Sequence, residues 1–117
     1  MTASDPTLRR ATVMLEKAGK EQKAGIWMTA SQMLASPAAN RVEVNLGRIS
    51  RISTKDAAIF VPGKVLGHGI VDKKLVVGAF SFSSSARAKI LAVGGTPLSI
   101  EQFLKRYPKG SGVHLVR

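Results

Sequence analysis

The sequence feature that most constrains the fold is the uninterrupted apolar run at residues 75–80, Leu-Val-Val-Gly-Ala-Phe. A strand with one face in water alternates apolar and polar residues, whereas a strand covered on both faces is apolar throughout. The run is therefore predicted to be a central strand of a sheet whose two faces are both covered.

Short strands and short helices are predicted before this run. A strand at 42–44 leads into a helix that Asn45 caps and whose buried face extends to Ile52. A second strand covers residues 57–61, and Pro62-Gly63 is expected to end it.

Serine residues predict where two later helices begin. Ser83 and the two serines after it can cap a helix that runs to about Val93, where Gly94-Gly95 closes it. Ser99 caps the next helix, and Gln102 three residues later completes a capping-box pattern. Two brief strands accompany that helix, at residues 96–98 and 113–116.

The first part of the chain, residues 1–40, is predicted to form a helical hairpin. Asp5-Pro6 has the pattern of a helix start, and Gly19 is expected to end this first helix. A second helix covers residues 25–35. The whole chain is thus predicted to be a single α/β domain, in which the hairpin precedes an α/β portion at 41–117.

A net charge of +11 on 117 residues separates this chain from an ordinary small domain, with 18 Lys and Arg against seven Asp and Glu. Self-repulsion of that size weakens a compact state unless a polyanion relieves it, and such basic domains are typical of nucleic-acid binding. The hydrophobic content of 44% excludes a disordered basic tail. The plainer alternative is a basic domain whose charge only keeps it soluble.

Several protein classes are disfavoured by what the composition lacks. The sequence holds no cysteine, so disulfides and thiolate metal sites are not expected, and a reducing cytoplasm suits it. No apolar run approaches the roughly 18 residues of a membrane span, and no signal peptide is expected. Aromatic residues make up 5%, too few for platforms that stack unpaired bases. Contact with phosphates is the better expectation.

The most suggestive local string is Gly-Lys-Val-Leu-Gly-His-Gly at residues 63–69. It is not a Walker A loop, because no Gly-Lys-Ser/Thr occurs in it. It is predicted to be a glycine-rich turn after a strand, for which two interpretations remain open. The turn could hold backbone N–H groups toward a phosphate, or it could simply join two strands.

Catalytic chemistry is not expected. His68 and His114 are the two histidines, and most of the seven carboxylates stand beside a Lys or Arg, where they form no acid/base pair. The serines suit helix capping better than a nucleophile elbow. We therefore expect no catalytic residue, no cofactor, no metal site and no small-molecule substrate.

The basic residues of the second part are predicted to form a broad surface that faces RNA phosphates, although each one alone could be a solvated surface charge. The candidate RNA-binding residues are Arg48, Arg51, Lys64, His68, Lys73, Lys74, Lys105, Arg106 and Lys109.

Five motifs occur in order along essentially the whole chain. They are Arg-Val-Glu-Val-Asn-Leu at 41–46 with Ile49, Val-Pro-Gly-Lys-Val-Leu-Gly at 61–67, Ala-Phe-Ser-Phe-Ser at 79–83, Gly94-Gly95, and Pro-Lys-Gly-Ser at 108–111. In these motifs the chain resembles the archaeal large-subunit ribosomal protein family numbered eighteen in the archaeal–eukaryotic series, a relative of the universal family numbered fifteen. One departure is the linker at 37–40, which is neutral where family members carry a basic run, so an RNA contact there is not expected.

The resemblance implies an α/β fold with irregular strand–strand–helix units around a small sheet. It also implies a structural constituent of the large (50S) subunit in the cytoplasm, one that binds and stabilises folded ribosomal RNA through basic residues and glycine turns. Its expected partners are large-subunit ribosomal RNA and neighbouring large-subunit ribosomal proteins, with no membrane and no catalysis.

Two other functions share part of the pattern. A DNA-binding chromosomal protein would carry the same charge, but no helix-turn-helix, arm or intercalating wedge is visible in the sequence. A small enzyme could use residues 63–69 as a phosphate loop, and saturable nucleotide binding that Lys64→Ala abolishes would identify it.

Overall fold

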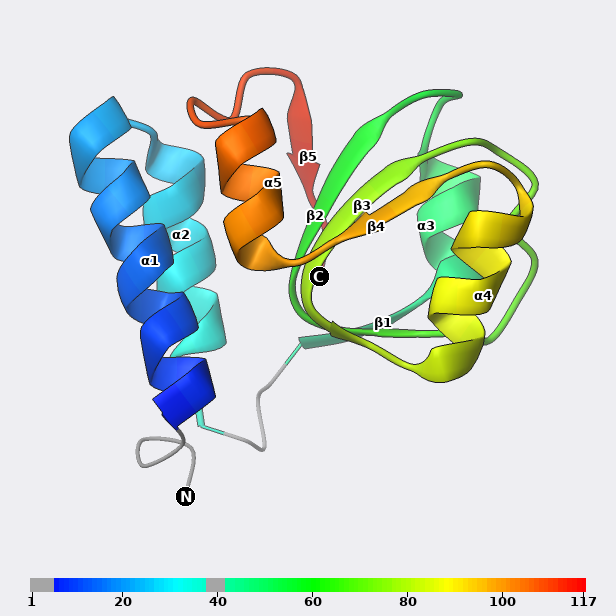
Figure 1. Ribbon diagram of the computed structural model, residues 1–117, viewed down its shortest axis with the longest axis horizontal. Helices are drawn as coiled ribbons and strands as arrows, with labels where there is room; N and C mark the ends of the chain where they lie inside the picture. Colours follow the sequence, from blue (N-terminus) through cyan, green and yellow to red (C-terminus); the bar gives the residue numbers. More distant parts are fainter. Residues whose placement is uncertain (1–5, 38–41) are drawn as a thin grey trace.

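The computed structural model describes residues 6–37 and 42–117. Its elements (Figure 1) are α1 (Pro6–Gln22), α2 (Gly25–Leu34), β1 (Val42–Asn45), α3 (Leu46–Ile52), β2 (Ala58–Leu66), β3 (Val76–Phe82), α4 (Ser84–Ala92), β4 (Thr96–Leu98), α5 (Ile100–Arg106) and β5 (Val113–Leu115). Asp5 and most of the neutral linker lie outside the described residues. The N-terminal helical hairpin and the α/β fold class are confirmed.

The sheet is parallel and has five strands in the order β1-β2-β3-β4, with β5 also paired to β2. Strands β5 and β1 pair with successive parts of β2, β5 with residues 58–60 and β1 with residues 63–66. The apolar run at 75–80 falls largely in β3, which lies between β2 and β4, so its prediction as a central strand is confirmed.

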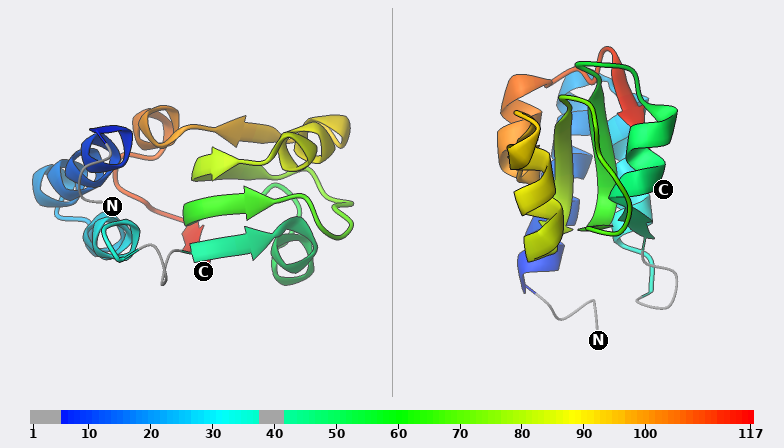
Figure 2. Two further views of the ribbon diagram at one scale, coloured as in Figure 1. Left: turned by 90° about the horizontal axis from the view of Figure 1, so that it is seen from below. Right: turned by 90° about the vertical axis from the view of Figure 1, so that its right-hand side faces the viewer.

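Helices cover both faces of the sheet, as an all-parallel sheet requires. Helices α1, α2 and α5 lie on one side of the strands, and α3 and α4 lie on the other (Figure 2). The core beneath α1, α2 and α5 centres on three fully buried aromatic rings, Trp27, Phe60 and Phe103. The Trp27 ring packs edge-on against Phe60, with 5.2 Å between ring centroids.

Gly19 does not end α1, contrary to prediction. The helix continues to Gln22, and the chain turns at Lys23, whose φ is +52°. Gly19 instead lies where α1 meets α2, because a Cβ atom on it would lie 2.7 Å from Cγ of Met28. The glycine is needed for the close approach of two helices and not for a turn.

Pro62-Gly63 does not end β2 either. The strand continues to Leu66, and its register with β3 shifts between Val61 and Lys64. Proline cannot donate a ladder hydrogen bond, and it is tolerated at this break in the pairing. The predicted turn at 63–69 is therefore strand as far as Leu66, and only residues 67–69 are loop.

Two details of α3 also differ from expectation. The Ile52 side chain is 57% exposed, so it does not share the buried face of the helix. Asn45 occupies the N-cap position, but its side chain makes no capping hydrogen bond. The capping box of Ser99 and Gln102 on α5 and the cap of Ser83 on α4 are both confirmed.

Ser83 makes a capping hydrogen bond and Asn45 does not, so replacing them should have different effects on stability. The Ser83 hydroxyl accepts a hydrogen bond from the Ala86 N–H at 3.1 Å. Ser83→Ala should lower the free energy of unfolding by about 0.5–2 kcal/mol, because that N–H loses its acceptor. Asn45→Ala is the matched control and should change it by less, since no such bond is lost. Urea denaturation followed by circular dichroism measures both, and equal losses would contradict the assignment.

Candidate nucleic-acid interface

Strands β2 and β3 are parallel neighbours, so the chain must return along the sheet between them. Residues 67–75 make this return without a helix, and we call them the crossover segment (Figure 1, right-hand side). Its first residues lie between α3 and α4. Lys89 Nζ of α4 donates to the carbonyls of Gly67 and Gly69, and the Gly47 N–H of α3 donates to the His68 carbonyl.

The second half of the crossover segment is attached to α3. The Ser50 hydroxyl donates to the Asp72 carboxylate at 3.0 Å, and Lys73 Nζ donates to the Ser50 carbonyl. A cation near the last carbonyls of a helix also interacts favourably with the helix dipole. The segment is thus fixed to both neighbouring helices, and its side chains have defined positions.

Arg48, Arg51 and His68 line one hollow, at the C-terminal ends of β1 and β2, which we call the strand-end hollow. Arg51 also lines a second hollow together with Lys73, which we call the adjoining hollow. Ligands of open parallel sheets commonly bind beyond the C-terminal ends of the strands. Three of the nine predicted residues, Arg48, Arg51 and His68, therefore lie together where such a sheet usually binds its ligand, and Lys73 lies in the hollow beside it.

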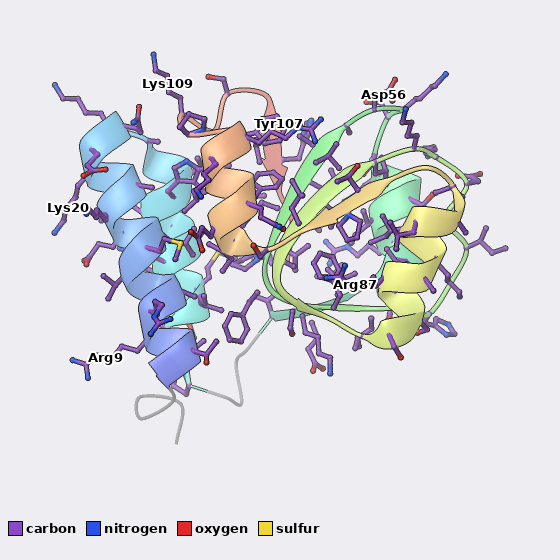
Figure 3. The ribbon with its side chains drawn as sticks, viewed as in Figure 1. Arg9, Lys20, Asp56, Arg87, Tyr107 and Lys109 are labelled. Carbon is purple, nitrogen blue, oxygen red and sulfur yellow. The ribbon has the colours of Figure 1, made fainter. Side chains whose placement is uncertain are left out.

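Lys74 and Arg106 line a third hollow, beside the first residues of β3 and β4. Asp56 and Tyr107 contribute to the same hollow, and the Arg106 guanidinium lies 5.7 Å from the Tyr107 ring centroid. Figure 3 shows Asp56 and Tyr107 along the top of the molecule. Lys73 and Lys74 are adjacent in sequence yet belong to different hollows.

The remaining three predicted residues lie apart from these hollows. Lys64 is exposed on β2, where its register partner is Glu43 on β1. Lys105 forms an ion pair with Glu101 at 3.6 Å on α5. Lys109 is exposed beyond α5, at the upper left of Figure 3. Six of the nine candidates therefore line the three hollows, and these three do not.

Lys89 was not among the candidates, although it organises the crossover segment. Its two carbonyl partners lie 20 and 22 residues away in sequence. Local patterns identify a basic helical residue here but not these contacts, so no sequence signal singled it out.

The cations that line the hollows form no ion pair with an acidic side chain of the described residues. Ion pairs in that part of the chain join Lys20 to Glu16 and Lys105 to Glu101, both within helices and away from the strand-end and adjoining hollows. Arg48 donates to the main-chain oxygen of Arg117. Glu43 and Asp72 line these hollows without forming an ion pair, so a net positive field remains there.

Residues 6–37 and 42–117 contain neither a metal-binding cluster nor a membrane-spanning helix. No group of three or more His, Asp or Glu side chains there could hold a metal ion. In the same ranges, every helix is too short or too polar to cross a membrane.

Known proteins similar to this chain identify both its class and its family. Residues 43–97 match a family model that describes ribosomal proteins, among them 50S-L15 and 50S-L18e. The large ribosomal subunit protein eL18 of Methanoregula boonei is 41% identical over 97% of this chain and 94% of its own length. The eL18 proteins of Archaeoglobus fulgidus and Haloarcula marismortui are 38% and 37% identical, over 99% and 100% of both chains.

The chain belongs to the eL18 family of large ribosomal subunit proteins. The resemblance inferred from the five motifs is thereby confirmed. Membership also confirms the expectation that the chain is a ribosomal protein and not an enzyme, since the family is one of structural ribosomal components.

Proposed function

We propose that this protein is a structural constituent of the large ribosomal subunit that binds and stabilises folded ribosomal RNA. Its partners would be large-subunit ribosomal RNA and neighbouring large-subunit ribosomal proteins. We expect no cofactor to take part in this function.

One observation carries the proposal: cations gather around hollows at both ends of the parallel sheet and form no ion pair with a described Asp or Glu. Arg48, Arg51, His68 and Lys73 line the strand-end and adjoining hollows, and Lys74 and Arg106 line the third. A polyanion stabilises a protein with this arrangement, and binding releases the counterions condensed on that polyanion.

The chemistry of these residues suits the RNA backbone better than base edges. A-form RNA has a deep, narrow major groove that side chains cannot read, so duplex RNA is bound through phosphates, 2′-hydroxyls and shape. Trp27, Phe60 and Phe103 are fully buried and cannot stack on bases. Arginine and lysine side chains at the hollows therefore supply the contacts.

The salt dependence of RNA binding tests the proposal. Arg48→Ala and Lys74→Ala should each weaken binding to a large-subunit RNA fragment and reduce the slope of log K against log salt by about one unit. The reason is that each variant releases one counterion fewer on binding. Filter binding at several salt concentrations measures the slope.

Lys20→Ala is the matched control, because Lys20 carries the same charge on α1 but pairs with Glu16 and lies away from the hollows. Its slope should stay unchanged. Slopes that do not respond to Arg48→Ala or Lys74→Ala would contradict the proposed interface. Equal affinity for duplex DNA and structured RNA would favour a DNA-binding protein instead.

A further inference from the structure

Part of the strand-end hollow is held in place by Lys89, a residue of α4 that does not line it. We propose that Lys89 is a positioning residue for RNA binding. It does not contact RNA, but it fixes residues 67–69 so that the hollow has its shape before RNA arrives. The proposal rests on the proposed function, because it concerns how that RNA interface is built.

Residues of two separate segments line the strand-end hollow. Six of them lie between Glu43 and Arg51, in β1 and α3, and the other two are His68 and Gly69 of the crossover segment. His68 and Gly69 belong to no helix or strand, so their position depends on contacts with other elements. A displacement of these two residues would change the hollow that Arg48 and Arg51 line.

Lys89 supplies two of those contacts. Its Nζ donates to the Gly67 carbonyl at 2.6 Å and to the Gly69 carbonyl at 2.9 Å. Hydrogen bonds from a charged donor are stronger than those between neutral groups. The two carbonyls flank His68, so the ammonium holds the backbone on both sides of that residue. Because Lys89 lines none of the three hollows, the role that follows is positioning and not direct contact.

Residues 67–69 also touch α3. The Gly47 N–H donates to the His68 carbonyl at 3.0 Å. A Cβ atom on Gly69 would lie 2.6 Å from the Gly47 Cα, so the two backbones are in contact there. The φ of Gly69 is +95°, which favours glycine. Lys89 therefore connects α4, through residues 67–69, to the first turn of the helix whose arginines line the hollow.

These contacts bear on affinity because a site that is formed in advance does not have to be ordered on binding. Without the Lys89 hydrogen bonds, residues 67–69 would occupy other positions for part of the time. Affinity falls in proportion to the share of molecules that are competent to bind. Loss of one hydrogen bond to a charged group corresponds to about a tenfold change in an equilibrium constant. We therefore expect RNA binding to be about tenfold weaker when residue 89 cannot donate.

Lys89→Met removes the donor and keeps a long aliphatic side chain. Filter binding to a large-subunit RNA fragment should be about tenfold weaker, with an unchanged slope of log K against log salt, since no phosphate contact is lost. Lys20→Met is the matched control, because Lys20 lines none of the three hollows, and it should change neither quantity. A slope lower by about one unit in Lys89→Met would show a direct phosphate contact and overturn the positioning role.

Gly69→Ala displaces the same residues without removing a charge. Its Cβ would meet the Gly47 Cα, so RNA binding should weaken at an unchanged slope, as in Lys89→Met. Gly112→Ala is the matched control: the φ of Gly112 is also positive, at +74°, but no atom lies within 4 Å of the Cβ it would add. If Gly69→Ala bound RNA as tightly as Gly112→Ala, the position of residues 67–69 would not matter and the proposal would be wrong.

Hydrogen exchange without RNA measures the positioning itself. The Gly47 N–H should exchange faster in Lys89→Met, because its acceptor on His68 is less firmly held. The Tyr107 N–H, which donates to the Phe103 carbonyl at 2.8 Å on α5, should be unaffected. Equal acceleration at both amides would indicate general destabilisation and overturn the specific role. If RNA binds the wild type and Lys89→Met equally, this role alone fails; if the wild type binds no RNA, the proposed function fails with it.

Discussion

Replacing Trp27 with alanine is expected to remove about 3–5 kcal/mol from the free energy of unfolding. The ring is fully buried and lies edge-on to Phe60 and Phe103, with 5.2 and 6.0 Å between ring centroids. Its Nε1 donates to the Pro108 carbonyl at 2.9 Å, which ties the hairpin to the segment after α5. Domains of this size are stable by only about 5–15 kcal/mol, so a large share of the stability would be lost.

The measurement is urea denaturation followed by far-ultraviolet circular dichroism, because Trp27 is the only tryptophan and the variant has no indole fluorescence. Trp27→Phe keeps an aromatic ring and should lose less. Val13→Ala is the exposed control, since Val13 is 54% accessible on α1. A Trp27→Ala variant no less stable than Val13→Ala would contradict this account of the core.

Gly63→Ala is expected to have a comparable effect through the backbone. A Cβ atom on Gly63 would lie 2.0 Å from the Val42 carbonyl oxygen, so β1 would have to move away from β2. Overpacking usually costs about 1–3 kcal/mol, and the upper end or more is expected here because the obstacle is backbone. Since β1 leads into α3, displacing it should also weaken RNA binding through Arg48 and Arg51.

Gly25→Ala is the matched control, because no atom lies within 4 Å of the Cβ it would add. It should leave the free energy of unfolding unchanged or raise it by up to about 1 kcal/mol, through reduced freedom of the unfolded chain. Thermal and urea unfolding measure the free energy of unfolding of both variants. A Gly63→Ala variant as stable as Gly25→Ala would mean that the two strands do not approach so closely.

Much of the fold could be predicted from local pattern. Ser83 and Ser99 are identifiable as caps from the sequence because each hydroxyl accepts from an N–H only three residues away. The central strand was identified because residues 75–80 are apolar on both sides. In each case the sequence window contains both partners of the interaction, or the whole pattern.

The two wrong helix and strand ends came from glycines. A glycine that breaks an element and one that lets two backbones approach look the same in sequence. At Gly19 the deciding neighbour is Met28 on another helix, and at Gly63 it is Val42 on another strand. Local propensity contains neither neighbour, so it placed both ends too early.

The candidate interface could likewise be predicted from the sequence only in part. Charge and residue type identified the basic residues and, through the ordered motifs, the ribosomal protein family. They did not show that Lys73 and Lys74 line different hollows, nor that Lys89 holds the carbonyls of the crossover segment. The sequence by itself determined the elements, the charge and the family, because these depend on residues close together or on composition. Only the tertiary structure decided which charges meet, because parallel strands bring together residues that are distant along the chain.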